Sequence, residues 1–182
     1  MRATIFLMIA VFVFQCCSEP IDTGNEKAEV IDTNVLIQLD SLWNIMVFED
    51  GGCLTGGQFV RNGQFGGEAC VMTDHHRRGK KWGSFFRHSR DELTLFLTTK
   101  LSDTTITKIH TCPCSNSTNG EVAVYTLHYL YKTNWFDLEG FESYGNKEGN
   151  GCEDNQQVWL QEVLLNEKSH LALKNQWLEM IK

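Results

Sequence analysis

The chain has 182 residues, of which 42% are hydrophobic, 11% aromatic and 21% charged, and its formal net charge is −7 at pH 7. A sequence with this apolar content and only two prolines is globular, which excludes a disordered or fibrous protein. Its length predicts one domain with a sizeable buried core.

The first element is an unbroken apolar run over residues 5–14, preceded by Arg2 and followed by the pair Cys16 and Cys17. A membrane-spanning helix needs roughly 20 apolar residues, so this run is too short to span and has the size of a secretory signal core. We therefore expect a signal peptide over residues 1–16 and an extracytoplasmic protein. No later segment of the sequence is apolar enough to cross a bilayer.

Residues 1–19 resemble the export signal of bacterial lipoproteins, in which a cysteine just after the apolar stretch is acylated and becomes the mature N-terminus. The resemblance implies acylation of Cys17, with Cys16 as the alternative acceptor. The acidic residues 17–32 would then be a flexible tether, and the membrane, reached through the lipid, would be the first partner. The alternative is an ordinary cleaved signal, which would give a secreted protein.

The rest of the chain, residues 33–182, is expected to form a single, mainly α-helical domain with a small glycine-rich β-hairpin. The alternative class is α+β. Helical spacing of apolar residues predicts the first helix over residues 33–48, with Asp32 as its N-cap. The glycine-rich residues 51–67 contain Asn62-Gly63, and Asn-Gly is typical of a tight hairpin turn.

Two capping boxes predict the starts of further helices, Ser89 with Glu92 and Thr118 with Glu121. In each pair, the two side chains can satisfy free backbone N–H groups at a helix start. Between these helices, residues 104–111 are rich in β-branched side chains, and an extra strand here would make the domain α+β.

The last two helices are expected over residues 155–165 and 169–181. Five helices and one hairpin result from these assignments. Packing of helices joined by short connections is therefore the expected architecture.

Five of the seven cysteines follow the N-terminal pair, and in an exported protein their first expected role is disulfide bonding. Cys53 and Cys70 bracket the glycine-rich hairpin, which would bring them close together. A Cys53–Cys70 bridge is therefore predicted. The alternative is that cysteines here are simply buried as small apolar residues.

A second cluster consists of His110, Cys112 and Cys114, which could supply three ligands to zinc or copper, with His128 as a fourth. One residue between the two cysteines makes a tighter chelate than zinc sites generally use. The alternative to the metal site is that Cys112 and Cys114 are each buried in the core or form separate disulfides. No other cofactor is predicted.

Asp74, His75 and His76 are similar to the tripeptide of the DHH phosphoesterases. The aspartate-rich motifs that complete that family's dinuclear metal site are not found, so we interpret the tripeptide as a surface loop. A metal-dependent hydrolase that uses both histidines and the His110 cluster is the main enzymatic alternative.

The basic stretch over residues 75–90 carries six Lys or Arg, three His and no acidic residue. Its cations lie next to aromatic residues, which is the composition of a surface that meets an anionic partner. The predicted patch consists of Arg77, Arg78, Lys80, Lys81, Trp82, Arg87 and Arg90. The alternative is that the aromatic residues belong to the core and the charges to a solvated loop.

No nucleophile elbow, zinc-protease motif or phosphate-binding glycine loop is present in the sequence. The expected function is therefore a binding or structural module of the cell envelope and not an enzyme. An anionic envelope component or a protein is the expected partner, and nucleic acid is not. An immunity-type or inhibitor protein is one concrete form of such a module.

Overall fold

The first helix of the computed structural model, α1 (Thr33–Asn44), begins where the sequence predicts it. The structure describes residues 31–54, 58–65, 79–111 and 115–181. Asp32 is the N-cap, and its side chain accepts a 2.8 Å hydrogen bond from the backbone N–H of Asn34. Leu39 and Trp43 are buried on the inner face of α1. The chain then continues for six residues as a π-helix, η1 (Ile45–Asp50).

Gly51 ends this helical segment in the left-handed region, with φ of 61°. A Cβ atom here would lie 2.4 Å from the backbone oxygen of Lys108. Glycine is therefore required both by the backbone conformation and by the close approach of strand β1 (Gly52–Cys53) to strand β4 (Ile106–Thr111).

The predicted Asn-Gly hairpin is confirmed. Strands β2 (Val60–Arg61) and β3 (Gln64–Phe65) pair antiparallel across Asn62 and Gly63. Both turn residues have positive φ, 51° and 72°, as a type I′ turn requires.

A separate three-stranded sheet has the order β1-β4-β5, where β5 spans Ser115–Thr118. β1 runs parallel to β4, and β5 runs antiparallel to it. Residues 106–111 of the β-branched segment form strand β4, as expected, whereas β1 has only two residues and was not predicted. The described fold is mainly α with this small sheet, which also fits the α+β alternative.

Two helices lie between β1 and β4 in the chain, α2 (Gly79–Phe85) and α3 (Arg90–Thr98). The capping box at the start of α3 is confirmed, because Glu92 accepts a hydrogen bond from the backbone N–H of Ser89 and donates its own N–H to the Ser89 hydroxyl. Helix α2 was not predicted, since its segment was interpreted as a basic surface.

Helix α4 (Asn119–Tyr131) forms the centre of the domain. Its predicted capping box is confirmed, because the backbone N–H of Thr118 donates to the carboxylate of Glu121 and the backbone N–H of Glu121 donates to the hydroxyl of Thr118, the N-cap. Every residue of α4 from Asn119 through His128 is buried. A helix that is buried on all sides must be covered by the surrounding elements on all sides.

The chain after α4 forms one 3₁₀ turn and three helices. The predicted helix over residues 155–165 is confirmed, and the last helix begins slightly earlier than expected because Asn166 is its N-cap. These elements are η2 (Trp135–Asp137), α5 (Glu142–Gly145), α6 (Gln156–Leu165) and α7 (Glu167–Glu179).

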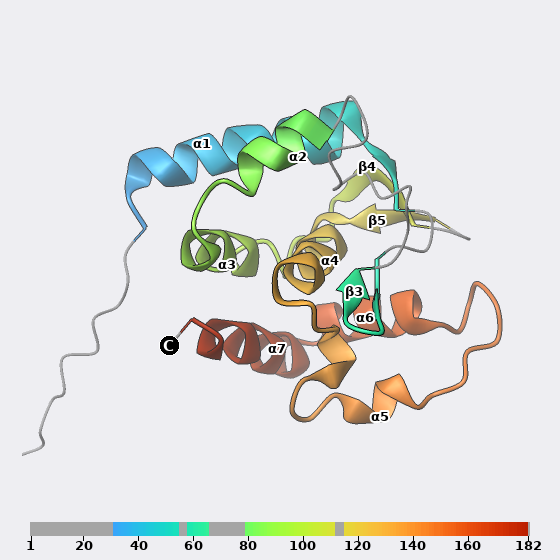
Figure 1. Ribbon diagram of the computed structural model, residues 1–182. Coiled ribbons are helices and arrows are strands. Elements are labelled where there is room, and N and C mark those ends of the chain that lie inside the picture. Colours follow the sequence, from blue (N-terminus) through green and yellow to red (C-terminus); the bar gives the residue numbers. More distant parts are fainter. Residues whose placement is uncertain (1–30, 55–57, 66–78, 112–114, 182) are drawn as a thin grey trace, which may run out of the picture. The chain divides into compact units, whose positions relative to one another are not determined.

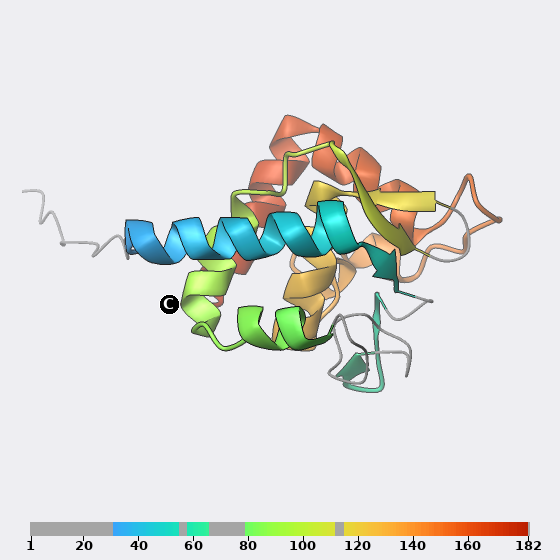
Figure 2. The same cartoon turned by 90° about the horizontal axis from the view of Figure 1, so that it is seen from above.

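Helices α1 and α2 lie over one side of α4, and α6 and α7 lie over the opposite side (Figure 1). Seen from above, α1 crosses the unit formed by Ile31–Lys182, with α3 beside it (Figure 2). The core contains all five tryptophans, each at most 1% exposed: Trp43, Trp82, Trp135, Trp159 and Trp177. Among the described residues, no helix has the length and apolar character needed to cross a membrane.

Candidate functional site

A groove of about 570 Å³ lies on the surface between α1 and α3. Two apolar side chains of α1 remain in contact with water at its edge, with Leu36 38% exposed and Ile37 63% exposed. The groove is lined by Leu36, Ile37, Asp40, Ser41, Phe96, Thr99 and Lys100.

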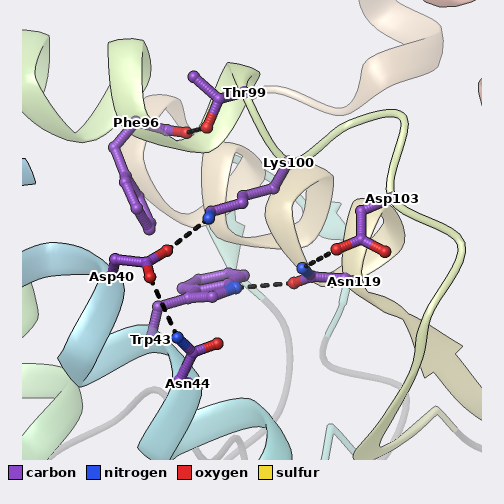
Figure 3. Close-up of polar contacts among 8 residues, drawn as sticks. All are labelled: Asp40, Trp43, Asn44, Phe96, Thr99, Lys100, Asp103 and Asn119. Atoms are coloured by element: carbon purple, nitrogen blue, oxygen red, sulfur yellow. Dashed lines mark hydrogen bonds and ion pairs between the residues drawn. The ribbon is translucent and has the colours of Figure 1, made fainter. Parts of the chain in front are cut away.

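An ion pair closes one wall of this groove. The ammonium of Lys100 lies 2.6 Å from Oδ1 of Asp40, and Oδ2 of Asp40 accepts a 3.2 Å hydrogen bond from the amide of Asn44 (Figure 3). The Lys100 ammonium also lies 4.9 Å from the centroid of the Phe96 ring. The side chain of Asp40 is 46% exposed, so solvent weakens the pair and its contribution to stability is small.

A buried polar chain lies behind the groove and holds α1 in place. The indole Nε1 of Trp43 donates to Oδ1 of Asn119 at 2.7 Å, and Nδ2 of Asn119 donates to Oδ2 of Asp103 at 2.7 Å (Figure 3). Burial raises the pKa of Asp103, but hydrogen bonds from Thr105 and Asn119 outweigh this effect, so the pKa is lowered overall. These hydrogen bonds join α1 to the start of α4.

The described residues of the predicted basic-aromatic patch differ in their burial and contacts. Trp82 is 1% exposed and packs edge-on against Trp43, so its assignment to a partner surface is wrong and its place is in the core. Lys81 forms a 2.7 Å ion pair with Asp50. Of the other predicted patch residues, Lys80 is exposed.

Two of the four arginines of the patch make contacts with nearby side chains, and the other two lie outside the described residues. The guanidinium of Arg87 donates to the hydroxyl of Ser84. The guanidinium of Arg90 lies over the ring of Tyr131, 5.2 Å from its centroid. Arg77 and Arg78 lie outside the described residues.

The candidate metal site cannot be assembled from the described residues. Only His110 of the three predicted ligands is among them, because Cys112 and Cys114 fall outside, and the described part of the chain contains no group of three or more His, Cys, Asp or Glu that could hold a metal ion. His128 is excluded as a fourth ligand. Its Nδ1 lies 2.9 Å from the carbonyl of Gln58 and its Nε2 accepts from the backbone N–H of Trp135 at 2.8 Å.

The sulfur of Cys53 lies 3.7 Å from Nδ1 of His110, on the neighbouring strand β4. Cys70 lies outside the described residues, so the Cys53–Cys70 bridge stays a prediction. Cys152 is disulfide-bonded.

The lipid-acceptor candidates Cys16 and Cys17 also lie outside the described residues. Comparison of the chain with protein-family models, with curated proteins and with solved structures found no match. The sequence analysis did not identify the groove, because its lining comes from two helices that are distant in the chain.

Proposed function

We propose that this protein is an exported, lipid-anchored binding module of the cell envelope, and that the groove between α1 and α3 receives a protein partner. The observation that carries the proposal is the groove itself, in which Leu36 and Ile37 remain exposed around an ion pair. Export is supported by the signal-like residues 1–16 and by the disulfide at Cys152, because disulfides persist in oxidising compartments.

The proposed occupant is the apolar face of a basic amphipathic helix. Helix α1 has twelve residues and is therefore about 18 Å long, so a groove beside it can accept anchor side chains that recur at helical spacing. Charge favours a basic partner, because the chain carries 23 acidic residues and a net charge of −7. A Lys or Arg of the partner would form an ion pair with Asp40, beside the Lys100 ammonium.

The partner can be tested by crosslinking from within the groove. A photoreactive benzoyl-phenylalanine at Ser41, an exposed lining residue, is installed in the full chain and irradiated in cells. We expect crosslinks to a basic amphipathic helix, mapped by mass spectrometry. Ile37→Asp should abolish them, because it places a charge against the apolar anchors.

The matched control is Leu171→Asp, which makes the same kind of change at a 53% exposed position of α7. This variant should crosslink like the wild type. Crosslinks that survive Ile37→Asp, or that map to lipid or to an acidic segment, would contradict the proposed groove partner.

The anchor is tested separately by mass spectrometry of the mature N-terminus. Acylated Cys17 or Cys16 is the expected result. A free and unmodified N-terminus at or beyond Ser18 would contradict the anchor and leave the groove unaffected.

A further inference from the structure

Strand β5 contains the acceptor motif for an N-linked glycan. Of the asparagines in the chain, only Asn116 is followed at the second place by serine or threonine, in Asn116-Ser117-Thr118. The transferases that attach N-linked oligosaccharides recognise this tripeptide when its middle residue is not proline. The sequence therefore offers one acceptor of this kind.

Asn116 lies where the folded protein can carry a bulky group. Its side chain is exposed, whereas that of Ser117 is fully buried. Successive side chains of a strand point to opposite faces, so Asn116 extends from the outer face of the sheet. β5 is also the last strand in the order β1-β4-β5. A glycan on Asn116 would therefore extend into solvent beside the edge of the sheet.

The other two residues of the motif are held by contacts of the fold. The hydroxyl of Thr118 accepts a 3.2 Å hydrogen bond from the backbone N–H of Glu121 and caps α4. The backbone carbonyl of Ser117 accepts a 2.9 Å hydrogen bond from the hydroxyl of Thr107 on β4. An enzyme that binds the tripeptide in its own active site must first break these contacts. The chain that has not yet folded offers the tripeptide without this cost.

We propose that Asn116 is N-glycosylated during export, before β5 and α4 have folded. Of the proposed function, the inference rests on export alone, so it applies equally to a lipid-anchored and to a secreted protein. N-linked glycans are bulky, solubilising groups on the surfaces of exported proteins. At this position the glycan also hinders the edge strand β5 from pairing with a strand of another molecule.

In the proposed step, the co-substrate is an oligosaccharide that is linked to a polyprenyl diphosphate. The side-chain amide nitrogen of Asn116 attacks the anomeric carbon of the first sugar. The N–C bond forms, the bond from that carbon to the diphosphate oxygen breaks, and the diphosphate departs with the electron pair while the amide nitrogen loses one proton. The transferase supplies the catalytic groups, and this chain supplies only the acceptor.

The test uses the full-length protein recovered from the cells that naturally export it. A peptide N-glycosidase in heavy-oxygen water converts a glycosylated asparagine to aspartate that carries the heavy oxygen, which mass spectrometry locates in the peptide. We expect this label at position 116 of the wild type. An exported wild type whose Asn116 is unmodified would overturn the proposal.

Three variants made in the same cells give the controls. Asn116→Gln should lose the glycan, whereas Thr118→Ser keeps the motif and the N-cap hydroxyl and should remain glycosylated. Asn175→Gln changes an exposed asparagine of α7 outside the motif, and it should be glycosylated like the wild type. A glycan that persists in Asn116→Gln would overturn the assignment. Acylation of the N-terminus is measured in the same sample, so a missing anchor and a missing glycan are separate results.

The order of glycosylation and folding is tested in vitro. Unglycosylated full-length chain is mixed with purified transferase and its lipid-linked donor, once folded and once diluted from urea at the moment of mixing. We expect the chain from urea to be glycosylated at Asn116 at least tenfold faster in its initial phase. Equal initial rates would overturn the proposal that glycosylation precedes folding.

Discussion

Trp43 and Asn119 are joined by a buried hydrogen bond of 2.7 Å, although they are separated by 76 residues in the chain. Trp43 extends from the first helix, and Asn119 is the first residue of the central helix. This contact ties α1, and the groove along it, to the centre of the domain.

Loss of the Asn119 amide should therefore destabilise the whole domain. Asn119→Ala leaves the indole N–H of Trp43 and the carboxylate of Asp103 without this partner, which we expect to lower the free energy of unfolding by about 2 kcal/mol. Urea denaturation measures the change. Asn175→Ala, at an exposed position of α7, should change it by less than about 0.5 kcal/mol; similar losses in the two variants would contradict the assigned role.

Stability should fall in mild acid because of His128. Burial lowers the pKa of this histidine from 6.5 to about 4. The unfolded chain therefore takes up a proton below pH 6.5 while the folded chain does not, and stability is lost as the pH falls from about 6.5 to about 4. The full loss would be about 3 kcal/mol.

The measurement is urea denaturation at several pH values in this window. His128→Gln should be less stable than wild type at pH 7, because it disturbs the contacts to Gln58 and Trp135. The same variant should lose much of the pH dependence between pH 6.5 and pH 4. An unchanged slope would show that other groups produce it.

Replacing each of the two capping-box glutamates by neutral glutamine should change the stability of the protein in opposite directions. Hydrogen bonds from Ser89 lower the pKa of Glu92, so Glu92→Gln should destabilise the protein at neutral pH by removing a favoured charge. Burial raises the pKa of Glu121, whose charge is therefore disfavoured in the folded state. The neutral form of Glu121 is compatible with its buried site, so the protein loses stability as the pH rises through the raised pKa and this carboxyl becomes charged.

Glu121→Gln should accordingly be tolerated, or should stabilise the protein, with its advantage growing toward high pH. The glutamine oxygen can still accept from the backbone N–H of Thr118 and from the amide of Gln161. Thermal unfolding of both variants at pH 5 and pH 8 checks the contrast. A stabilised Glu92→Gln together with a destabilised Glu121→Gln would reverse the prediction.

The groove residues should matter little for stability. Ile37 is 63% exposed, so Ile37→Asp should change the free energy of unfolding by about 0.5 kcal/mol or less. Leu39, two positions along the same helix, is fully buried, and Leu39→Ala should cost about 2–5 kcal/mol. Equal costs in chemical denaturation would mean that Ile37 serves the fold and not a binding surface.

Local signals in the sequence were sufficient for several elements of the fold. A capping box or an Asn-Gly turn acts within a few neighbouring residues, so Ser89, Thr118 and Asn62 could be interpreted without knowledge of the tertiary structure. The same applies to the β-branched residues of β4.

Features that depend on distant contacts could not be predicted in this way. Strand β1 has two residues and exists only because β4, more than fifty residues later, pairs with it. Trp82 lies in a basic segment, and only the packing of α2 against α1 shows that its ring is buried. The groove likewise arises from α1 and α3 together, so no single segment carries its signature.

The distribution of the indoles has a consequence for spectroscopy. Each of α1, α2, η2, α6 and α7 contributes one buried tryptophan. Indoles excluded from water emit at shorter wavelengths than indoles exposed to it, so intrinsic fluorescence samples five separate elements without any label. Detachment of one element would shift only part of the emission, whereas cooperative unfolding would shift all of it in one transition.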